Sequence, residues 1–356
     1  MGTGESALLW EQMDLDGVTR DFESLFPSFS FDGKAVLADI LEGQIWEAFK
    51  KLGNGITDAV LFQRGEYRTL FFTILILGVT AALFAGFADL FQDHQVSDLA
   101  FYFIYLLLIA VLLKFFAGTV GTVREVLGSV TTFIKLYIPT YILAVGSASG
   151  AASAAAYYHL LLVVVYLIEW GFLTILLPIV QGYVLLTVIN GVWTGEKLAL
   201  LLELLEKGIS GSIKASLWLV TGFSLLQSMI SPVIDSLQSG TLKKALSALP
   251  GVGGLTEGMF EMVLGSAVLV RNSLGLYLTL LLIVLCAVPV LKIALTACVI
   301  KLSAALVGII SDKRLTNCVS RVGQGNLMLL KLTLTCVGMF LIQVAIISYS
   351  TGQLVR

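Results

Sequence analysis

Residues 99–118 read LAFYFIYLLLIAVLLKFFAG, and this stretch decides the fold class. Lys114 is its one charged residue. An α-helix rises about 1.5 Å per residue, so about 20 residues cross the roughly 30 Å hydrocarbon core of a bilayer. The stretch therefore predicts a membrane-spanning helix.

The composition of the whole chain favours the same class. Apolar residues make up 57% of the 356 residues and charged residues 13%, and the mean hydropathy is +0.93. Soluble domains carry about a quarter charged residues, which cover their hydrated surface. This chain has too few for that purpose, so lipid is its remaining solvent. We expect an all-α, polytopic membrane protein, because backbone polar groups in lipid must be paired within the structure.

Eight other stretches are apolar enough to be candidate spans. They are residues 69–88, 130–148, 154–170, 172–190, 215–231, 274–291, 293–310 and 327–349. The stretch 293–310 follows Pro289 and Lys292 too closely for a hairpin. It therefore either continues the preceding helix through a kink or lies along the membrane interface. We expect about seven to nine membrane helices.

Charge and hydropathy together divide the chain into four parts. The first 68 residues hold 12 acidic and 6 basic side chains, out of totals of 24 and 22, so the N-terminal part is acidic and the remainder mildly basic. The parts are a small, acidic and partly helical head (1–66), a first membrane bundle of about six spans (67–231), a glycine-rich segment (232–273) and C-terminal membrane helices (274–356).

Two segments have the pattern of amphipathic helices. In residues 37–52, apolar side chains recur every three or four positions, with Glu47 and Lys51 paired on another face and residues 53–55 ending the helix. In residues 196–210, four leucines lie opposite Glu203 and Lys207, which is typical of an interfacial helix rather than a span.

Loop charges predict part of the orientation. The loop 311–331 is expected to be cytoplasmic by the positive-inside rule, because it carries Lys313, Arg314, Arg321 and Lys331. The early loops disagree about the head. Arg64 and Arg68 favour a cytoplasmic head, whereas the loop with Asp89, Asp93 and Asp98 has no basic residue.

Small residues spaced four apart predict helix-packing faces. They are Gly78, Ala82 and Gly86 in the first span, and Ala144, Ala148, Ala152 and Ala156 around the third and fourth. Such rows let helix backbones approach closely in lipid. Packing within one molecule and packing against another subunit, including a second copy of the chain, are both open.

Ionisable residues inside spans are costly and therefore informative. Lys114 and Glu169 lie near segment ends, so we expect them to snorkel to the membrane surface. Lys301 lies on a narrow face of small residues, so we expect its ammonium to point into protein or a wet crevice. A structural ion pair and a role in permeation are both compatible with that position.

The glycine-rich stretch 249–275 reads LPGVGGLTEGMFEMVLGSAVLVRNSLG. Non-helical backbone at membrane depth is tolerated where protein covers it or where it lines a water-filled cavity. A re-entrant or hinge element is one interpretation, with Pro250, Gly251, Gly253, Gly254 and Gly275 as its candidate residues. An extramembrane loop followed by an amphipathic helix is the other.

Signatures of enzymes and cofactors are not found in the sequence. There is neither a GxxxxGK[ST] nor an HExxH motif. Gly208–Gly211 match the GxSG of rhomboid proteases, whose chemistry also needs a histidine on a later helix as base. Both histidines of this chain, His94 and His159, lie upstream of Ser210. The four cysteines lack metal-ligand spacing, and a net charge of −2 disfavours nucleic acid. We expect no catalytic residue, cofactor or metal.

Three runs carry a resemblance to a known family. They are Pro250 to Gly254, the run GSAVLVRNSLG (265–275), and the run CAVPVLKIALTACVIKL (286–302), which Asp312 follows. With these residues, the chain resembles the stage III sporulation protein AE family of endospore-forming bacteria.

The resemblance implies a membrane subunit of the channel or secretion-like complex that links mother cell and forespore. It implies ring-forming partners, a cytoplasmic ATPase and a location in the mother-cell membrane around the forespore. Candidate contacts with the conduit or with partners are Lys292, Lys301, Asn272, Arg271 and Pro289. Family precursors begin with a leader peptide, which the N-terminus MGTGESALLWEQMDLDG does not resemble.

Two functions remain in competition. The first is a non-enzymatic subunit of such a complex. The second is an autonomous secondary transporter, which would bind solute midway through the bilayer on broken helices. Pro178 and Pro289 interrupt spans in the two halves of the chain, but no convincing internal repeat accompanies them.

Overall fold

The computed structural model describes five long ranges of the chain. They are residues 64–91, 94–149, 163–192, 197–246 and 286–352, with isolated positions between 39 and 57 and residue 283. Side chains are described within residues 64–84, 101–132, 163–192, 197–223 and 286–342, and at the isolated positions and residue 99.

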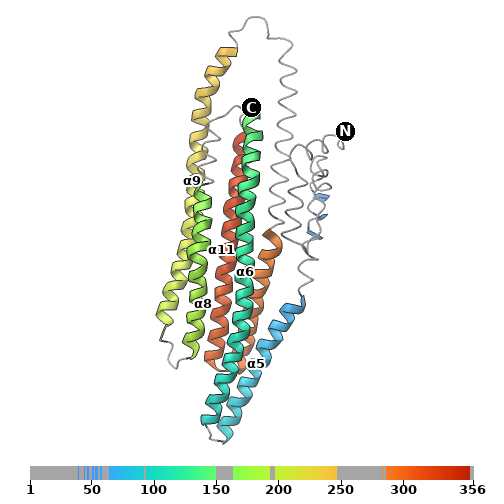
Figure 1. The fold of residues 1–356 in the computed structure, drawn as a ribbon, viewed down its shortest axis with the longest axis vertical. Helices are drawn as coiled ribbons and strands as arrows, with labels where there is room; N and C mark the ends of the chain where they lie inside the picture. Colours follow the sequence, from blue (N-terminus) through green and yellow to red (C-terminus); the bar gives the residue numbers. More distant parts are fainter. Residues whose placement is uncertain are drawn as a thin grey trace.

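These ranges form long helices and, within them, no strand (Figure 1). The labelled helices are α5 (Arg64–Phe91), α6 (His94–Ser149), α8 (Leu177–Val192), α9 (Ala199–Leu246) and α11 (Lys313–Gly352). The π-helical turn η1 (Phe172–Leu176) lies within a longer helix, Val163–Val192, and a further helix runs over Cys286–Ile310. The all-helical class predicted from composition is confirmed for the described residues.

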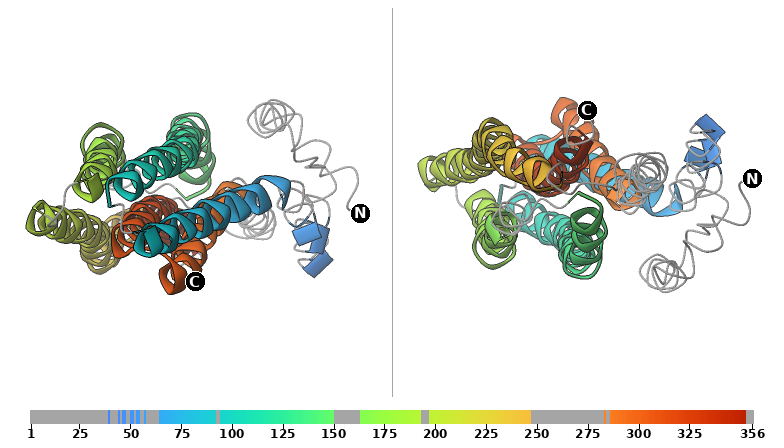
Figure 2. Two further views of the ribbon diagram at one scale, coloured as in Figure 1. Left: turned by 90° about the horizontal axis from the view of Figure 1, so that it is seen from below. Right: turned by 90° about the horizontal axis from the view of Figure 1, so that it is seen from above.

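Helix α11 is the centre of the bundle. It packs on α6, α8 and α9, beside which it lies in the end-on views (Figure 2). Its most apolar stretch is 56% buried, whereas that of α5 is 22% buried. Its mean hydropathy over the span is 1.7, compared with 2.3 for the span in α6. A helix surrounded by protein needs little lipid-compatible surface, so α11 can carry polar residues into the interior.

Six helix ends lie towards the same end of the molecule, the lower end of Figure 1. They are the C-terminal ends of α5, Val163–Val192 and Cys286–Ile310, and the N-terminal ends of α6, α9 and α11. This arrangement follows from α5, Val163–Val192 and Cys286–Ile310 running one way and α6, α9 and α11 running back.

The described residues contain five helices long and apolar enough to cross a membrane. They are Arg64–Phe84, Phe101–Thr132, Val163–Val192, Cys286–Ile310 and Lys313–Ile342. This supports a polytopic membrane protein, but the expected number of seven to nine is not confirmed. The expected span 274–291 lies largely outside the described residues.

The break expected between residues 118 and 130 is wrong. Residues 99–118 and 130–148 belong to one continuous helix of 56 residues, α6. No proline interrupts this segment, and buried valines at Val120, Val123, Val126 and Val130 keep helical spacing through it. Arg124 and Glu125 are exposed on the outer side of this continuous helix.

The expected turn at Gly171 is also absent, because the helix Val163–Val192 runs through it. The irregularity is the π-helical turn η1, in which the Leu177 N–H donates to the Phe172 carbonyl. Pro178 follows immediately. Proline clashes with the carbonyl four residues earlier, and a wider turn relieves such a clash. The proline therefore perturbs the helix without ending it.

Of the other two expectations for helix boundaries, the one between residues 210 and 215 is wrong and the one for residues 293–310 is confirmed as a continuation. Residues 196–210 and 215–231 were expected as an interfacial helix and a separate span, but from Ala199 onward they lie in one helix, α9, which also runs past residue 231. Glycine lowers helix propensity but does not by itself end a helix, and α9 runs through both Gly208 and Gly211. Residues 293–310 continue the helix that begins by Cys286, which confirms the expected continuation, while the kink stays a prediction.

The head is described only at isolated positions. Lys51 Nζ lies 2.6 Å from Asp39 Oδ2, so the ion pair shown is with Asp39 rather than with Glu47. The helix expected to end at residue 53 continues, because Gly53, Asn54 and Thr57 are helical. The Thr57 hydroxyl contacts the carbonyls of Gly53 and Asn54 at 2.9 and 2.8 Å, as in a continuing turn.

Glycines allow two close helix contacts. A Cβ added at Gly78 would lie 2.7 Å from Val307 Cγ2, so this predicted packing residue contacts another helix of the same molecule. A Cβ added at Gly325 would overlap the Val184 side chain, which joins α11 to α8. Five other predicted packing residues lie outside the ranges whose side chains the structure describes. These residues are Gly86, Ala144, Ala148, Ala152 and Ala156.

Candidate functional site

A polar cluster connects three helices inside the bundle. We define the central polar cluster as Lys301, Ser320, Glu206 and Gln324. Gln324 on α11 donates from Nε2 to Glu206 Oε1 on α9 at 2.7 Å. Lys301 Nζ lies 3.4 Å from Ser320 Oγ, which places the ammonium against α11. The Glu206 carboxylate attracts the Lys301 ammonium across the cluster.

The backbone of α11 explains how a lysine fits here. A Cβ added at Gly323 would lie 3.1 Å from Lys301 Cγ and 3.2 Å from its Cδ. The aliphatic part of Lys301 therefore lies against bare backbone, and only its end reaches Ser320. Lys301 is half-buried. Its ammonium therefore contacts protein, which is one of the two surroundings expected for it.

Helix α8 adds uncharged polar groups to the same region. The side-chain oxygens Tyr183 Oη and Thr187 Oγ1 of α8, and Asn326 Oδ1 of the adjoining α11, are buried. None of them makes a hydrogen bond of ordinary geometry within the described part of the chain, although Thr187 and Glu206 lie close to the Tyr183 hydroxyl. Glu206 and Arg321 are close enough to act electrostatically on Tyr183. Leaving a buried polar atom unpaired costs about 1–3 kcal/mol, so such atoms are normally satisfied by ordered water. A few buried polar groups therefore lie beside apolar contacts, such as that of Val184 with Gly325, between α8 and α11.

Glu169 is buried, contrary to the expectation that it snorkels. It is 1% exposed. The Thr131 hydroxyl on α6 contacts Oε2 at 2.8 Å, and the Cys336 thiol on α11 contacts Oε1 at 3.1 Å. The reason is its position on the helix, because Val165 and Phe172 on the same face are also buried. Glu169 therefore links three helices.

Outside the candidate spans, α9 exposes an ion pair to solvent. Lys207 Nζ lies 2.7 Å from Glu203 Oε1, one helical turn away. The Lys207 ammonium lowers the pKa of the Glu203 carboxyl, and Glu203 in turn raises the pKa of Lys207. Both groups are therefore charged at neutral pH, as expected for the polar face of this amphipathic segment.

Of the predicted contact residues, the structure describes Lys292, Lys301 and Pro289, and it places the two lysines in different surroundings. Lys301 belongs to the central polar cluster, whereas Lys292 lines a cavity about 13.5 Å away along the same helix, given about 1.5 Å per residue. Pro289 is buried in that helix. The remaining candidates lie outside the described residues. They are Arg271, Asn272, Pro250, Gly251, Gly253, Gly254 and Gly275.

Sequence reasoning missed Glu206, Gln324 and Tyr183. Glu206 lies among solvent-facing charges of an amphipathic segment, and its helical position alone does not separate it from Glu203. Gln324 lies between Gly323 and Gly325, and that small-residue pair was the available signal of a close helix contact. Within the described residues, no three His, Cys, Asp or Glu side chains gather as metal ligands.

The geometry is that of a helical bundle whose largely apolar interior holds a few polar side chains, and comparison with known proteins now identifies the family. The family model described as stage III sporulation protein AE matches residues 31–351. The chain belongs to this family. The match includes all five candidate spans and confirms the resemblance seen in the sequence.

The chain is similar in sequence to a relative within the stage III sporulation protein AE family. The stage III sporulation protein AE of Bacillus subtilis (strain 168) is 23% identical over 238 residues, which cover 66% of this chain and 59% of that protein. The match thus spans less than two thirds of the relative's length. No solved structure matches this chain. Family membership supports a role in sporulation, and the apolar helices support a membrane location.

Proposed function

We propose that this chain is a non-enzymatic integral membrane subunit of the channel or secretion-like complex that links mother cell and forespore. The observation that carries the proposal is the family match over residues 31–351, which spans the whole described bundle. The partners would be ring-forming subunits and a cytoplasmic ATPase. The location would be the mother-cell membrane around the forespore, with residues 311–331 in the cytoplasm.

The surface of the bundle is compatible with a subunit in lipid. Large apolar side chains are exposed on α5 and α6, among them Ile76 at 62% and Phe103 at 69%. Apolar surface of this kind is stable against lipid or against another membrane subunit, but not in water. Both kinds of neighbour are available to a subunit of a membrane complex.

The interior supports a role beyond anchoring. The central polar cluster places Lys301, which is half-buried within a candidate span, close to the half-buried Glu206 of α9. Ionisable groups within membrane segments are costly and usually mark a pathway or a partner contact. We assign Lys301 to one of these two roles in the assembled complex.

An autonomous secondary transporter is the alternative function. The π-helical turn η1 next to buried Glu169 is the observation in its favour, because transporters bind solutes where membrane helices are irregular. In this function the chain would move a solute without any other subunit.

Purification from sporulating cells distinguishes the two functions. We expect a tagged full-length chain to carry the ring-forming and ATPase subunits with it, and vesicles containing the chain alone to move solutes no faster than empty vesicles. An unrelated polytopic membrane protein with the same tag is the control. Solute uptake by the isolated chain, without co-purifying subunits, would instead establish the transporter.

A further inference from the structure

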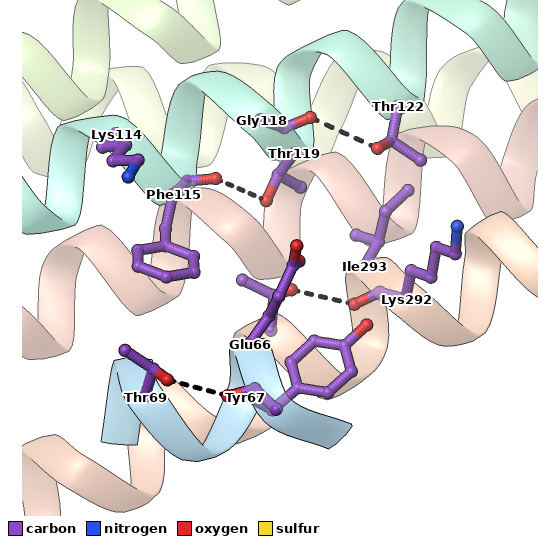
Figure 3. A pocket seen from close by; sticks show the side chains of 12 residues that line it. Glu66, Tyr67, Thr69, Lys114, Phe115, Gly118, Thr119, Thr122, Lys292 and Ile293 are labelled. Carbon is purple, nitrogen blue, oxygen red and sulfur yellow. Dashed lines mark hydrogen bonds between the residues drawn. The ribbon is translucent and has the colours of Figure 1, made fainter. Parts of the chain in front are cut away.

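A cavity of about 680 Å³ lies between the start of α5, the middle of α6 and the helix Cys286–Ile310 (Figure 3). Each of these three elements contributes one charged side chain, which are Glu66, Lys114 and Lys292. Threonines from all three line it as well, among them Thr119 and Thr296. It is separate from the central polar cluster and plays no part in the proposed function.

The depth of the cavity can be estimated along one helix. Lys292 precedes Ile310 by 18 residues, which correspond to about 27 Å at about 1.5 Å per residue. The charged turn with Asp312 and Lys313 follows Ile310 directly. The hydrocarbon core is about 30 Å thick. If that turn lies at one membrane surface, the cavity lies at the level of the opposite surface, where lipid phosphates are found.

The charges of the cavity favour an anion. Neither Lys114 nor Lys292 has an ion pair or a side-chain hydrogen bond with any residue that the structure describes. With Glu66, the three charges sum to one net positive charge. Two ammonium groups within candidate spans are costly unless water or a counter-ion solvates them. The two lysines lie on opposite sides of the cavity (Figure 3), and an anion bound in the cavity would lower that cost for the lysine that it meets.

The threonine hydroxyl groups of the cavity indicate which hydrogen-bonding groups a ligand would need besides its negative charge. Thr69, Thr119, Thr122 and Thr296 donate to carbonyls four residues earlier, at 2.8, 3.0, 3.2 and 2.9 Å (Figure 3). A hydroxyl has one proton, so these oxygens can only accept further hydrogen bonds. The cavity thus offers ammonium donors from lysines, and acceptors from threonines and Glu66. The matching ligand has anionic oxygens and hydroxyl or amine donors of its own.

We propose that this cavity binds a phosphate ester that carries hydroxyl or amine groups. Lys114 and Lys292 hold the phosphate oxygens, while the threonine oxygens and Glu66 accept from the substituent. An anionic phospholipid headgroup and a soluble compound such as glycerol phosphate share this chemistry. Basic cavities between membrane helices are suited to lipid headgroups.

Ligand-induced stabilisation tests the proposal, because a ligand that binds only the folded state raises its melting temperature. The full-length chain is placed in phosphatidylcholine nanodiscs. Phosphatidylglycerol is then added to the lipid in one arm and glycerol phosphate to the buffer in the other. We expect one of the two to raise the melting temperature, and the arm that does so identifies the source of the phosphate.

Variants connect the effect to the cavity. Lys114→Gln and Lys292→Gln should each weaken binding about tenfold, as expected for one lost charge-assisted hydrogen bond. Lys331→Gln is the matched control, because Lys331 is an exposed lysine within a span that does not line the cavity. Native mass spectrometry of the unmutated chain, with each phosphate ester added, counts bound ligand without relying on variants.

Two results would overturn the proposal. One is that neither phosphate ester stabilises or remains bound to the unmutated chain. The other is that Lys331→Gln weakens binding as much as the two cavity variants do, which would indicate a general effect of surface charge. Neither result bears on co-purification of partner subunits, so the proposed function is tested separately.

Discussion

Gly325 decides how closely α11 approaches α8. An added methyl group would overlap Val184 Cγ2. Valine is branched at Cβ and has few alternative rotamers, so the overlap is relieved only by moving a helix. We expect Gly325→Ala to destabilise the protein by about 1–3 kcal/mol, as is typical of overpacking. Thermal unfolding in detergent measures the change.

Gly338→Ala is the control on the same helix. Nothing lies within 4 Å of a Cβ at Gly338, so we expect this variant to melt close to the unmutated protein. Equal melting temperatures for the two variants would show that α8 and α11 are not in close contact at Gly325.

At the scale of the element, α11 is held to α9 by a polar contact. The Gln324–Glu206 hydrogen bond is part-buried at 2.7 Å and involves a charged acceptor. Such bonds contribute about 1.5–3 kcal/mol. We expect a double-mutant cycle of Glu206→Ala and Gln324→Ala to give a coupling energy in the lower part of that range. Unfolding of the four proteins in detergent measures it.

The exposed pair on α9 provides the comparison. Glu203 and Lys207 are also 2.7 Å apart, but both are solvent-exposed. Surface ion pairs contribute little, so their cycle should give a much smaller coupling than the part-buried pair. The opposite ranking would contradict the contact between α9 and α11.

At the scale of the whole molecule, the fold predicts a topology. The turn at Asp312 and the connection at Lys197 lie at one end of the bundle, whereas α5 begins at Arg64 and runs towards that end (Figure 1). In a Cys298→Ser background, we expect Asp312→Cys and Lys197→Cys to react with an impermeant thiol reagent from the cytoplasmic side. Arg64→Cys should react from the other side.

The native thiols make this labelling experiment practicable. Cys286, Cys318 and Cys336 are buried and Cys298 is exposed, so only the last requires replacement. The background protein without added cysteines is the control. Reaction of Arg64→Cys and Asp312→Cys from the same side would exclude α5 as a membrane span.

The sequence predicted some residues of the interior and not others. Lys301 was expected to point into protein or a wet crevice, and its half-buried side chain places the ammonium against Ser320 of α11. Glu169 was misjudged because its distance along the chain from a segment end says nothing about which way it faces. Glu206 and Gln324 are 118 residues apart, and no local pattern pairs them.

The sequence by itself determined that this chain is helical, lies in a membrane and belongs to its family. Hydropathy is a sum over consecutive residues, and the residues typical of the family are read directly from the sequence. Neither requires knowledge of contacts between distant segments. Only the tertiary structure decided that α6 continues through residue 124, that Glu169 meets Cys336, and that Lys114 and Lys292 share a cavity. Those contacts depend on how far helices rotate and how closely they approach. Glycines and side chains on distant segments set both quantities.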